Sequence, residues 1–257
     1  MARMNKSSNP ALREKIFERE SARTIHISEE GTMSVKGTLN KFLFIFAMAM
    51  CTSVYSWFAF EKGQSVAPMI MIGAFGGLGL AILMSFKMKW SKYLAPAYGL
   101  CEGLFLGAIS AMFSQMFAEK APYIVIQAVL LTFGVVLTMW TLYRTRVIKV
   151  TNRLRMIIVG ATGGIFVFYL LTWVLGFFGV NIPFMSATNG STFGIIFSLV
   201  VVGVAALNLL LDFDMIEKGS QMGAPKYMEW YCAFGLMVTI VWLYIEILRL
   251  LSRLNSR

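Results

Sequence analysis

The sequence predicts an all-α membrane protein, built as a bundle of seven transmembrane helices. Of the 257 residues, 58% are apolar and only 14% are charged, and the mean hydropathy is +0.69. A typical soluble domain is about 45–50% apolar and about 25% charged. A water-soluble globule of this size cannot bury so much apolar surface. The composition therefore excludes a soluble enzyme, a disordered chain and a disulfide scaffold.

The apolar residues fall into long runs, and about 20 residues suffice to cross a bilayer. The run over residues 156–211 has no charge and is too long for one crossing, so the polar stretch 181–192, with Pro183 and Gly190, must divide it. Because lipid cannot satisfy backbone amides, the runs must be helices. Six spans remain the alternative if the last run is re-entrant. We expect a polar tail over 1–40 and a membrane domain over 41–254, with spans near 42–60, 63–86, 93–118, 121–143, 156–180, 192–213 and 230–251.

The basic residues predict how the chain is oriented. Eighteen of the 23 Lys and Arg residues lie in the first 41 residues and in the loops at 87–92, 144–155 and 215–228. Loops rich in Lys and Arg stay in the cytoplasm, so we expect a cytoplasmic N-terminus. The short loops and the tail favour a bacterial inner membrane as the location. Seven spans would put the C-terminus on the outer side, whereas three arginines near it (Arg249, Arg253 and Arg257) favour the cytoplasmic side. The net charge of +10 thus reflects membrane orientation, not nucleic-acid binding.

Small residues in the spans predict close helix packing. Glycines spaced four apart occur in the second span (Gly73 and Gly77), the third (Gly99, Gly103 and Gly107) and the fifth (Gly160 and Gly164). Such spacing lets two backbones approach closely in lipid. We expect each set to pack against another helix of the same chain.

Acidic residues inside the spans are the candidates for function, because an ionisable group in lipid costs at least a few kcal/mol. Glu102, Asp214 and Glu246 qualify, and Asp212 and Glu229 lie at span borders. Four of them have a structural alternative: an ion pair of Asp214 with Lys218, an ion pair of Glu246 with Arg249, a protonated Glu102 bonded to a neighbouring helix, and a helix-dipole role for Glu229. Asp212 and Asp214, two residues apart, point to roughly opposite faces.

The sequence contains no recognisable catalytic set. It shows no Ser-His-Asp arrangement and no phosphate loop, and the single histidine, His26, lies in the tail. The three cysteines lie inside apolar runs without metal spacing. We therefore expect neither an enzyme nor a cofactor. Carboxyl groups in a bundle without a nucleophile suit proton or cation handling, and two that lie close together share a proton and act as a pH switch.

Three segments carry a family resemblance: Glu102-Gly-Leu-Phe-Leu-Gly-Ala-Ile, Leu211-Asp-Phe-Asp-Met-Ile-Glu217 and Trp242-Leu-Tyr-Ile-Glu-Ile-Leu-Arg-Leu-Leu251. With them the chain resembles the Bax inhibitor-1 family. The tail segment Ser8-Asn-Pro-Ala-Leu12 resembles its bacterial YccA-like branch. The resemblance implies a seven-helix bundle with the last helix central and a pH-sensitive calcium leak, in which protonation or calcium changes a bridge between two aspartates in the last two helices.

The resemblance assigns the first of these acids to Asp214, which would also make a weak calcium contact. The second has two candidates. Aligning the Leu-Tyr-x-acid motif selects Glu246, whereas aligning the helices without a gap selects Thr239, which is no acid. The two positions are seven residues apart and share a helical face. We favour Glu246.

Two functions follow as expectations. The first is a pH-sensitive cation leak channel, with Asp214, Glu246 and Glu102 sensing ions or protons, and with Asp212, Thr239 and Glu229 as further candidates. Calcium, or protons, would then be the transported ion, and no bound cofactor is expected. The alternative is a non-transporting regulator that binds a membrane protease or another membrane partner, as the resemblance also implies. The lipid bilayer is a partner in both.

Overall fold

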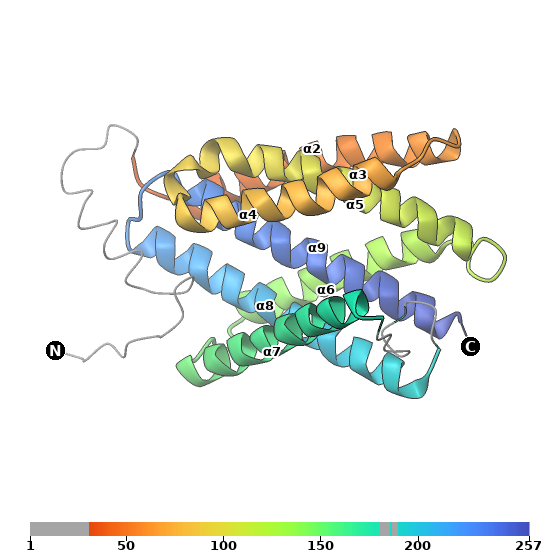
Figure 1. Cartoon of the computed structure of the whole chain (residues 1–257). Helices are drawn as coiled ribbons and strands as arrows, with labels where there is room; N and C mark the ends of the chain where they lie inside the picture. Colours follow the sequence, from red (N-terminus) through yellow and green to blue (C-terminus); the bar gives the residue numbers. More distant parts are fainter. Residues whose placement is uncertain (1–30, 180–185, 187–189, 257) are drawn as a thin grey trace. The chain divides into compact units, whose positions relative to one another are not determined.

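A computed structural model describes residues 31–179, 186 and 190–256 (Figure 1). Over these residues it contains seven helical segments long and apolar enough to cross a membrane, and it contains no strand beyond an isolated bridge between Thr32 and Pro225. The predicted all-α membrane fold is confirmed. His26 and most of the polar stretch 181–192 lie outside the described residues. The segments are α2 (Val35–Glu61), α3–η1–α4 (Ala67–Phe86), η2–α5 (Met88–Met116), α6 (Ile124–Arg144), α7 (Asn152–Phe177), α8 (Thr192–Gln221) and α9 (Met228–Leu254).

The helices extend beyond the charge-free runs that locate them. Helix α2 begins at Val35, whereas the apolar run begins at 42, and α8 continues to Gln221, past the predicted end at 213. Charge density marks where a segment enters lipid, but a helix can continue into water on polar residues. Asp214 and Lys218 therefore lie on the same continuous helix as the apolar run.

Short polar side chains cap three of the helices. Ser34 precedes α2 and accepts a hydrogen bond from the amide of Gly37, and Thr151 caps α7 through the amide of Leu154. Ser191 accepts from the amide of Gly194 at the start of α8. Each bond satisfies one of the amides that the first turn of a helix leaves without a partner.

The end of α8 is fixed by a glycine. Gly223 adopts φ +65°, a conformation that costs glycine little. The amide of Ala224 bonds to the carbonyl of Gly219, and the amide of Gly223 to that of Ser220, which is the Schellman pattern. Pro225 follows and prevents helix continuation. The chain therefore turns sharply here and begins α9 at Met228.

Contacts divide the chain into two compact units. Of the described residues, the first unit comprises 31–56, 67–105 and 214–237, and the second comprises 57–66, 106–179, 186, 190–213 and 238–256. In the first unit α2, α4 and α5 run side by side (Figure 1). A Cβ on Gly99 would lie 2.7 Å from the carbonyl of Ile45, and one on Gly103 would collide with Ala49 and Thr52. The close packing predicted for the third span is confirmed there.

The second span also packs through its glycines. A Cβ on Gly73 would lie 2.6 Å from Cβ of Phe105, and one on Gly77 would lie 2.8 Å from Oε1 of Glu102. The turn Ile72–Gly76, which includes Gly73 and ends just before Gly77, is π-helical. Such turns are rare and occur often at functional sites.

The prediction for the fifth span is wrong. A Cβ on Gly160 or Gly164 meets no described atom within 4 Å. Only 6% of the most apolar stretch of α7 is buried, against 61% in α9. Gly160 and Gly164 of α7 therefore lie on an open face of the helix. Helix α9 is the most buried of the seven described spans.

Candidate functional site

The predicted site residues belong to different units. Glu102, Asp214 and Glu229 lie in the first, and Asp212, Thr239 and Glu246 in the second. The described part of the chain holds no group of three or more His, Cys, Asp or Glu side chains that could bind a metal ion. The contacts given below for each acid lie within one unit.

Glu246 is 2% exposed and lies in a network with two other side chains. Arg249, three residues later on α9, donates to Oε1 at 2.9 Å and to Oε2 at 3.2 Å. The hydroxyl of Tyr169, on α7, donates to Oε1 at 3.0 Å, and Arg249 also contacts this hydroxyl at 2.8 Å. The guanidinium lies 5.3 Å from the centre of the Tyr169 ring. The predicted ion pair with Arg249 is confirmed. The negative charge of Glu246 is therefore paired with a positive charge inside the second unit.

Sequence reasoning missed Tyr169. It lies within a charge-free run, where its ring alone gave no reason to select it. The available signal was chemical, because a buried tyrosine hydroxyl generally needs a hydrogen-bond partner. The spacing of residues along α7 could not indicate which acid of α9 would supply that partner.

Asp212 and Thr239 are brought together, one from α8 and one from α9. The Thr239 side chain hydrogen-bonds the Asp212 carboxyl group. The other carboxyl oxygen, Oδ2, is buried and has no hydrogen-bond partner among the described residues. Buried polar atoms are nearly always bonded, so each exception needs an explanation. Thr239 is the position that the alignment without a gap selected opposite Asp214. In the structure it is a hydrogen-bond partner of Asp212.

Asp214 forms the predicted ion pair within its own helix. Nζ of Lys218 lies 3.0 Å from Oδ2, and the Asp214 side chain is 9% exposed. Helical neighbours four residues apart contact each other readily. The Asp214 carboxylate, which the sequence selected for a calcium contact, is therefore already paired with Lys218.

Glu102 is bonded within its own helix. Its carboxyl group hydrogen-bonds Tyr98, one turn earlier on α5. Oε1 packs against Gly77 of α4, where no side chain occupies the space. The expected partner on a neighbouring helix is therefore replaced by a tyrosine of the same helix, while α4 contributes only a close backbone.

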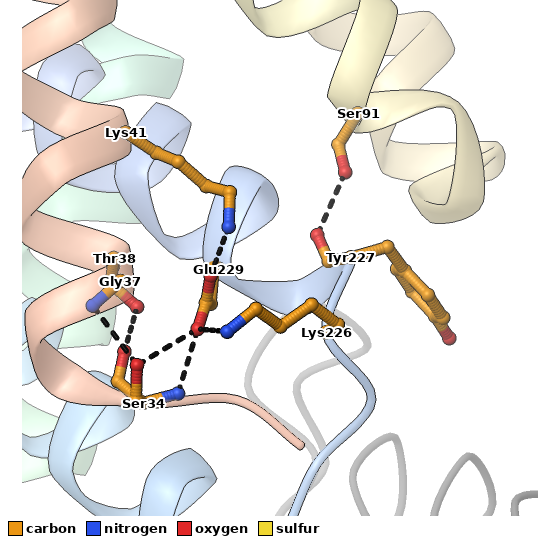
Figure 2. Close-up of polar contacts among 8 residues, drawn as sticks. All are labelled: Ser34, Gly37, Thr38, Lys41, Ser91, Lys226, Tyr227 and Glu229. Atoms are coloured by element: carbon orange, nitrogen blue, oxygen red, sulfur yellow. Dashed lines mark hydrogen bonds and ion pairs between the residues drawn. The ribbon is translucent and has the colours of Figure 1, made fainter. Parts of the chain in front are cut away.

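Glu229 is fully buried and has more polar contacts than its position at a helix start suggested (Figure 2). It pairs with Lys41 of α2 and, at 2.9 Å, with Lys226. The amide and the hydroxyl of Ser34 donate to Oε1 at 2.9 and 3.0 Å. The acid lies in the first turn of α9, as the dipole interpretation requires. Its main role in the first unit is to connect α2 with the start of α9.

Arg253 was counted only as a C-terminal charge, yet it is fully buried. It donates to the carbonyl of Gly194 at 2.6 Å, to Oγ of Ser198 at 2.7 Å and to the carbonyl of Ser186 at 3.3 Å. These bonds attach the end of α9 to the beginning of α8. A charged side chain in the last turn gave no signal that it points inward.

The comparisons with known proteins agree with this architecture. A search of the curated proteins found no match. A family model described as Bax inhibitor 1 like matches residues 9–256, which is nearly the whole chain. The match includes all seven spans and every acid described above. This membrane protein therefore belongs to the Bax inhibitor 1 like family.

Proposed function

We propose that the protein is a pH-sensitive cation leak channel, with calcium as the cation, and that it is not an enzyme. The observation that carries this proposal is Oδ2 of Asp212, a buried carboxyl oxygen without a described hydrogen-bond partner. Among the described acids it is the one best suited to accept an ion. Glu246 and Asp214 already pair with Arg249 and Lys218.

The chemistry at Asp212 supports a leak more than tight binding. Calcium takes 6–8 oxygen ligands, and a carboxylate with a threonine hydroxyl supplies only a few of them. Water and backbone carbonyls would complete the shell, so a passing cation would be held weakly. A proton binds the same oxygen, so protons and cations compete there. That competition is the proposed origin of the pH dependence.

The distribution of Lys and Arg supports the rest of the proposal. The cytoplasmic side would hold the tail and the basic loops, as the positive-inside rule implies. We therefore propose that the N-terminus lies in the cytoplasm. The short loops, and the tail segment Ser8–Leu12 that resembles the bacterial branch, support a bacterial inner membrane as the location. No bound cofactor is needed for a passive leak.

The test is calcium flux into liposomes that contain the full-length protein, at about pH 6 and pH 8. Wild type should pass calcium at rates that differ between the two pH values. Asp212→Asn should remove this difference, and Thr239→Val should reduce it. Glu119→Gln, at an exposed acid between α5 and α6, is the matched control and should behave as wild type. Wild-type flux equal to that of empty liposomes at both pH values would contradict the channel proposal.

Asp214→Asn and Glu246→Gln test the assignment within the channel proposal. If either removes the pH dependence while Asp212→Asn preserves it, the leak stands but the ion site is elsewhere. If only Asp212→Asn acts, the paired acids have structural roles. The two results are distinguishable in one series of measurements.

One observation favours the alternative, a non-transporting regulator of a membrane protease or another membrane protein. Helix α7 buries little of its apolar surface, and Gly160, Gly163 and Gly164 face open space. Small residues on an open face permit close approach of another helix. Absence of flux, together with a smaller detergent-extracted complex in a Gly160→Leu, Gly164→Leu variant, would favour this function.

A further inference from the structure

The turn that joins the second span to the third carries an unusual alternation of aromatic and basic side chains. Phe86, Trp90 and Tyr93 are 80%, 56% and 69% exposed. Lys87, Lys89 and Lys92 lie between them and are exposed as well. We call residues 86–93 the α4–α5 corner. No acidic residue occurs from 62 to 101, so its positive charge is not offset by the neighbouring sequence.

Backbone and side-chain bonds give the α4–α5 corner a defined shape. The amide of Lys87 bonds to the carbonyl of Leu83 at the end of α4, and the amide of Trp90 bonds to the carbonyl of Lys87. Ser91 is fully buried, and its hydroxyl donates to the carbonyl of Tyr227 at 3.1 Å (Figure 2). The corner is therefore attached to the segment that begins α9, and its lysines project from a fixed turn.

The lysine and aromatic side chains suit one environment. Aromatic rings concentrate at the level of lipid headgroups, where their apolar body meets lipid and their edge meets water. Lysines at the same level attract anionic lipids. Nζ of Lys92 lies 4.9 Å from the centre of the Tyr93 ring, so the two kinds of side chain are in contact. Both spans end here, which puts the charges at the membrane surface.

We propose that the α4–α5 corner binds the phosphate headgroup of an anionic membrane lipid. Lys87, Lys89 and Lys92 hold the phosphate, while Phe86, Trp90 and Tyr93 border its acyl chains. The occupant is a lipid and not a soluble phosphate, because the rings on either side of the lysines require an apolar neighbour. This interaction goes beyond the proposed leak activity and does not depend on it.

Quenching of Trp90 fluorescence tests the proposal in the full-length protein reconstituted in bilayers. Brominated phosphatidylglycerol and brominated phosphatidylcholine are compared at equal mole fraction, and the signal of Trp90→Phe is subtracted to isolate Trp90. We expect wild type to prefer the anionic lipid about fivefold or more, since each lysine near the surface contributes about 1 kcal/mol. Replacing all three lysines by glutamine should bring this preference close to one.

Two controls make the result specific. Replacing the same lysines by arginine keeps the charge and should keep the preference. Lys62→Gln with Lys120→Gln removes two exposed lysines outside the corner. Each follows an acidic residue that offsets its charge, so this variant should leave the preference unchanged. A wild-type preference near one, or an unchanged preference in the triple glutamine variant, overturns the proposal. Equal melting temperatures in detergent establish that the variants are folded.

Discussion

The carboxylate of Glu229 occupies the space that a Cβ on Gly37 would need. The two residues lie near the starts of α9 and α2, and the acid is fully buried between them. A glycine at this place is therefore a requirement of packing, because the acid and its two lysines leave no room for a side chain.

Gly37→Ala should destabilise the protein by about 1–3 kcal/mol, the usual cost of forcing extra atoms into a packed site. Glu229 would have to move away from Ser34 or Lys41. Thermal unfolding in detergent measures the effect. Gly79→Ala is the matched control, since a Cβ there meets no described atom within 4 Å, and it should be neutral or slightly stabilising. Equal losses at both positions would contradict the prediction.

Glu229→Gln should cost about 3 kcal/mol of unfolding free energy, because removing one partner of a buried ion pair leaves the other charge without compensation. The value lies at the low end of the usual range, since Lys41 and Lys226 keep some access to solvent. Denaturant unfolding of Glu229→Gln beside the exposed-site variant Glu119→Gln gives the measurement. A loss no greater than that of the control would show that the contacts around Glu229 contribute little.

Tyr169→Phe and Arg249→Gln should be strongly non-additive, because both side chains contact Glu246 and each other. Tyr169→Phe removes a bond to a charged group, worth about 1.5–3 kcal/mol. Arg249→Gln should cost more, since it leaves a buried acid without its cation. A double-mutant cycle on stability should give a coupling of at least about 0.5 kcal/mol. Additive losses would mean that the three groups do not act as one network.

Gly103→Ala should destabilise the protein, and Gly160→Ala should not. At Gly103 the added methyl group collides with Ala49 and Thr52, where α2 and α5 cross, whereas at Gly160 it meets open space. Both positions lie inside helices, so alanine improves helix propensity equally at each. The difference in melting temperature between the two variants isolates the helix contact, and a difference of zero would refute it.

Much of the fold could be predicted from the sequence, because lipid imposes a simple rule. Each segment that crosses must be helical and nearly free of charge, so the long apolar runs, with the longest divided at its polar stretch, predict seven helices. Ion pairs within one helix were predictable for the same kind of reason. Asp214 with Lys218 and Glu246 with Arg249 are neighbours by helical geometry alone.

Contacts between helices were not predictable in this way. Glycine spacing is the same in the third span and the fifth, yet Gly103 lies against α2 and Gly160 lies against nothing described. Spacing shows that a helix can be approached closely, but whether another helix does so depends on where the remaining spans pack. Arg253 gives the same lesson, since its burial depends on Gly194 and Ser198 of another helix.

The sequence by itself determined that this chain crosses a membrane as helices and which acids lie within the spans. Only the tertiary structure decided what each acid contacts. It gave Glu246 a tyrosine from α7, gave Asp212 a threonine from α9, and surrounded Glu229 with Ser34, Lys41 and Lys226. The physical reason is reach: a side chain contacts its own helix only three or four residues away, whereas a partner from another helix is fixed by packing.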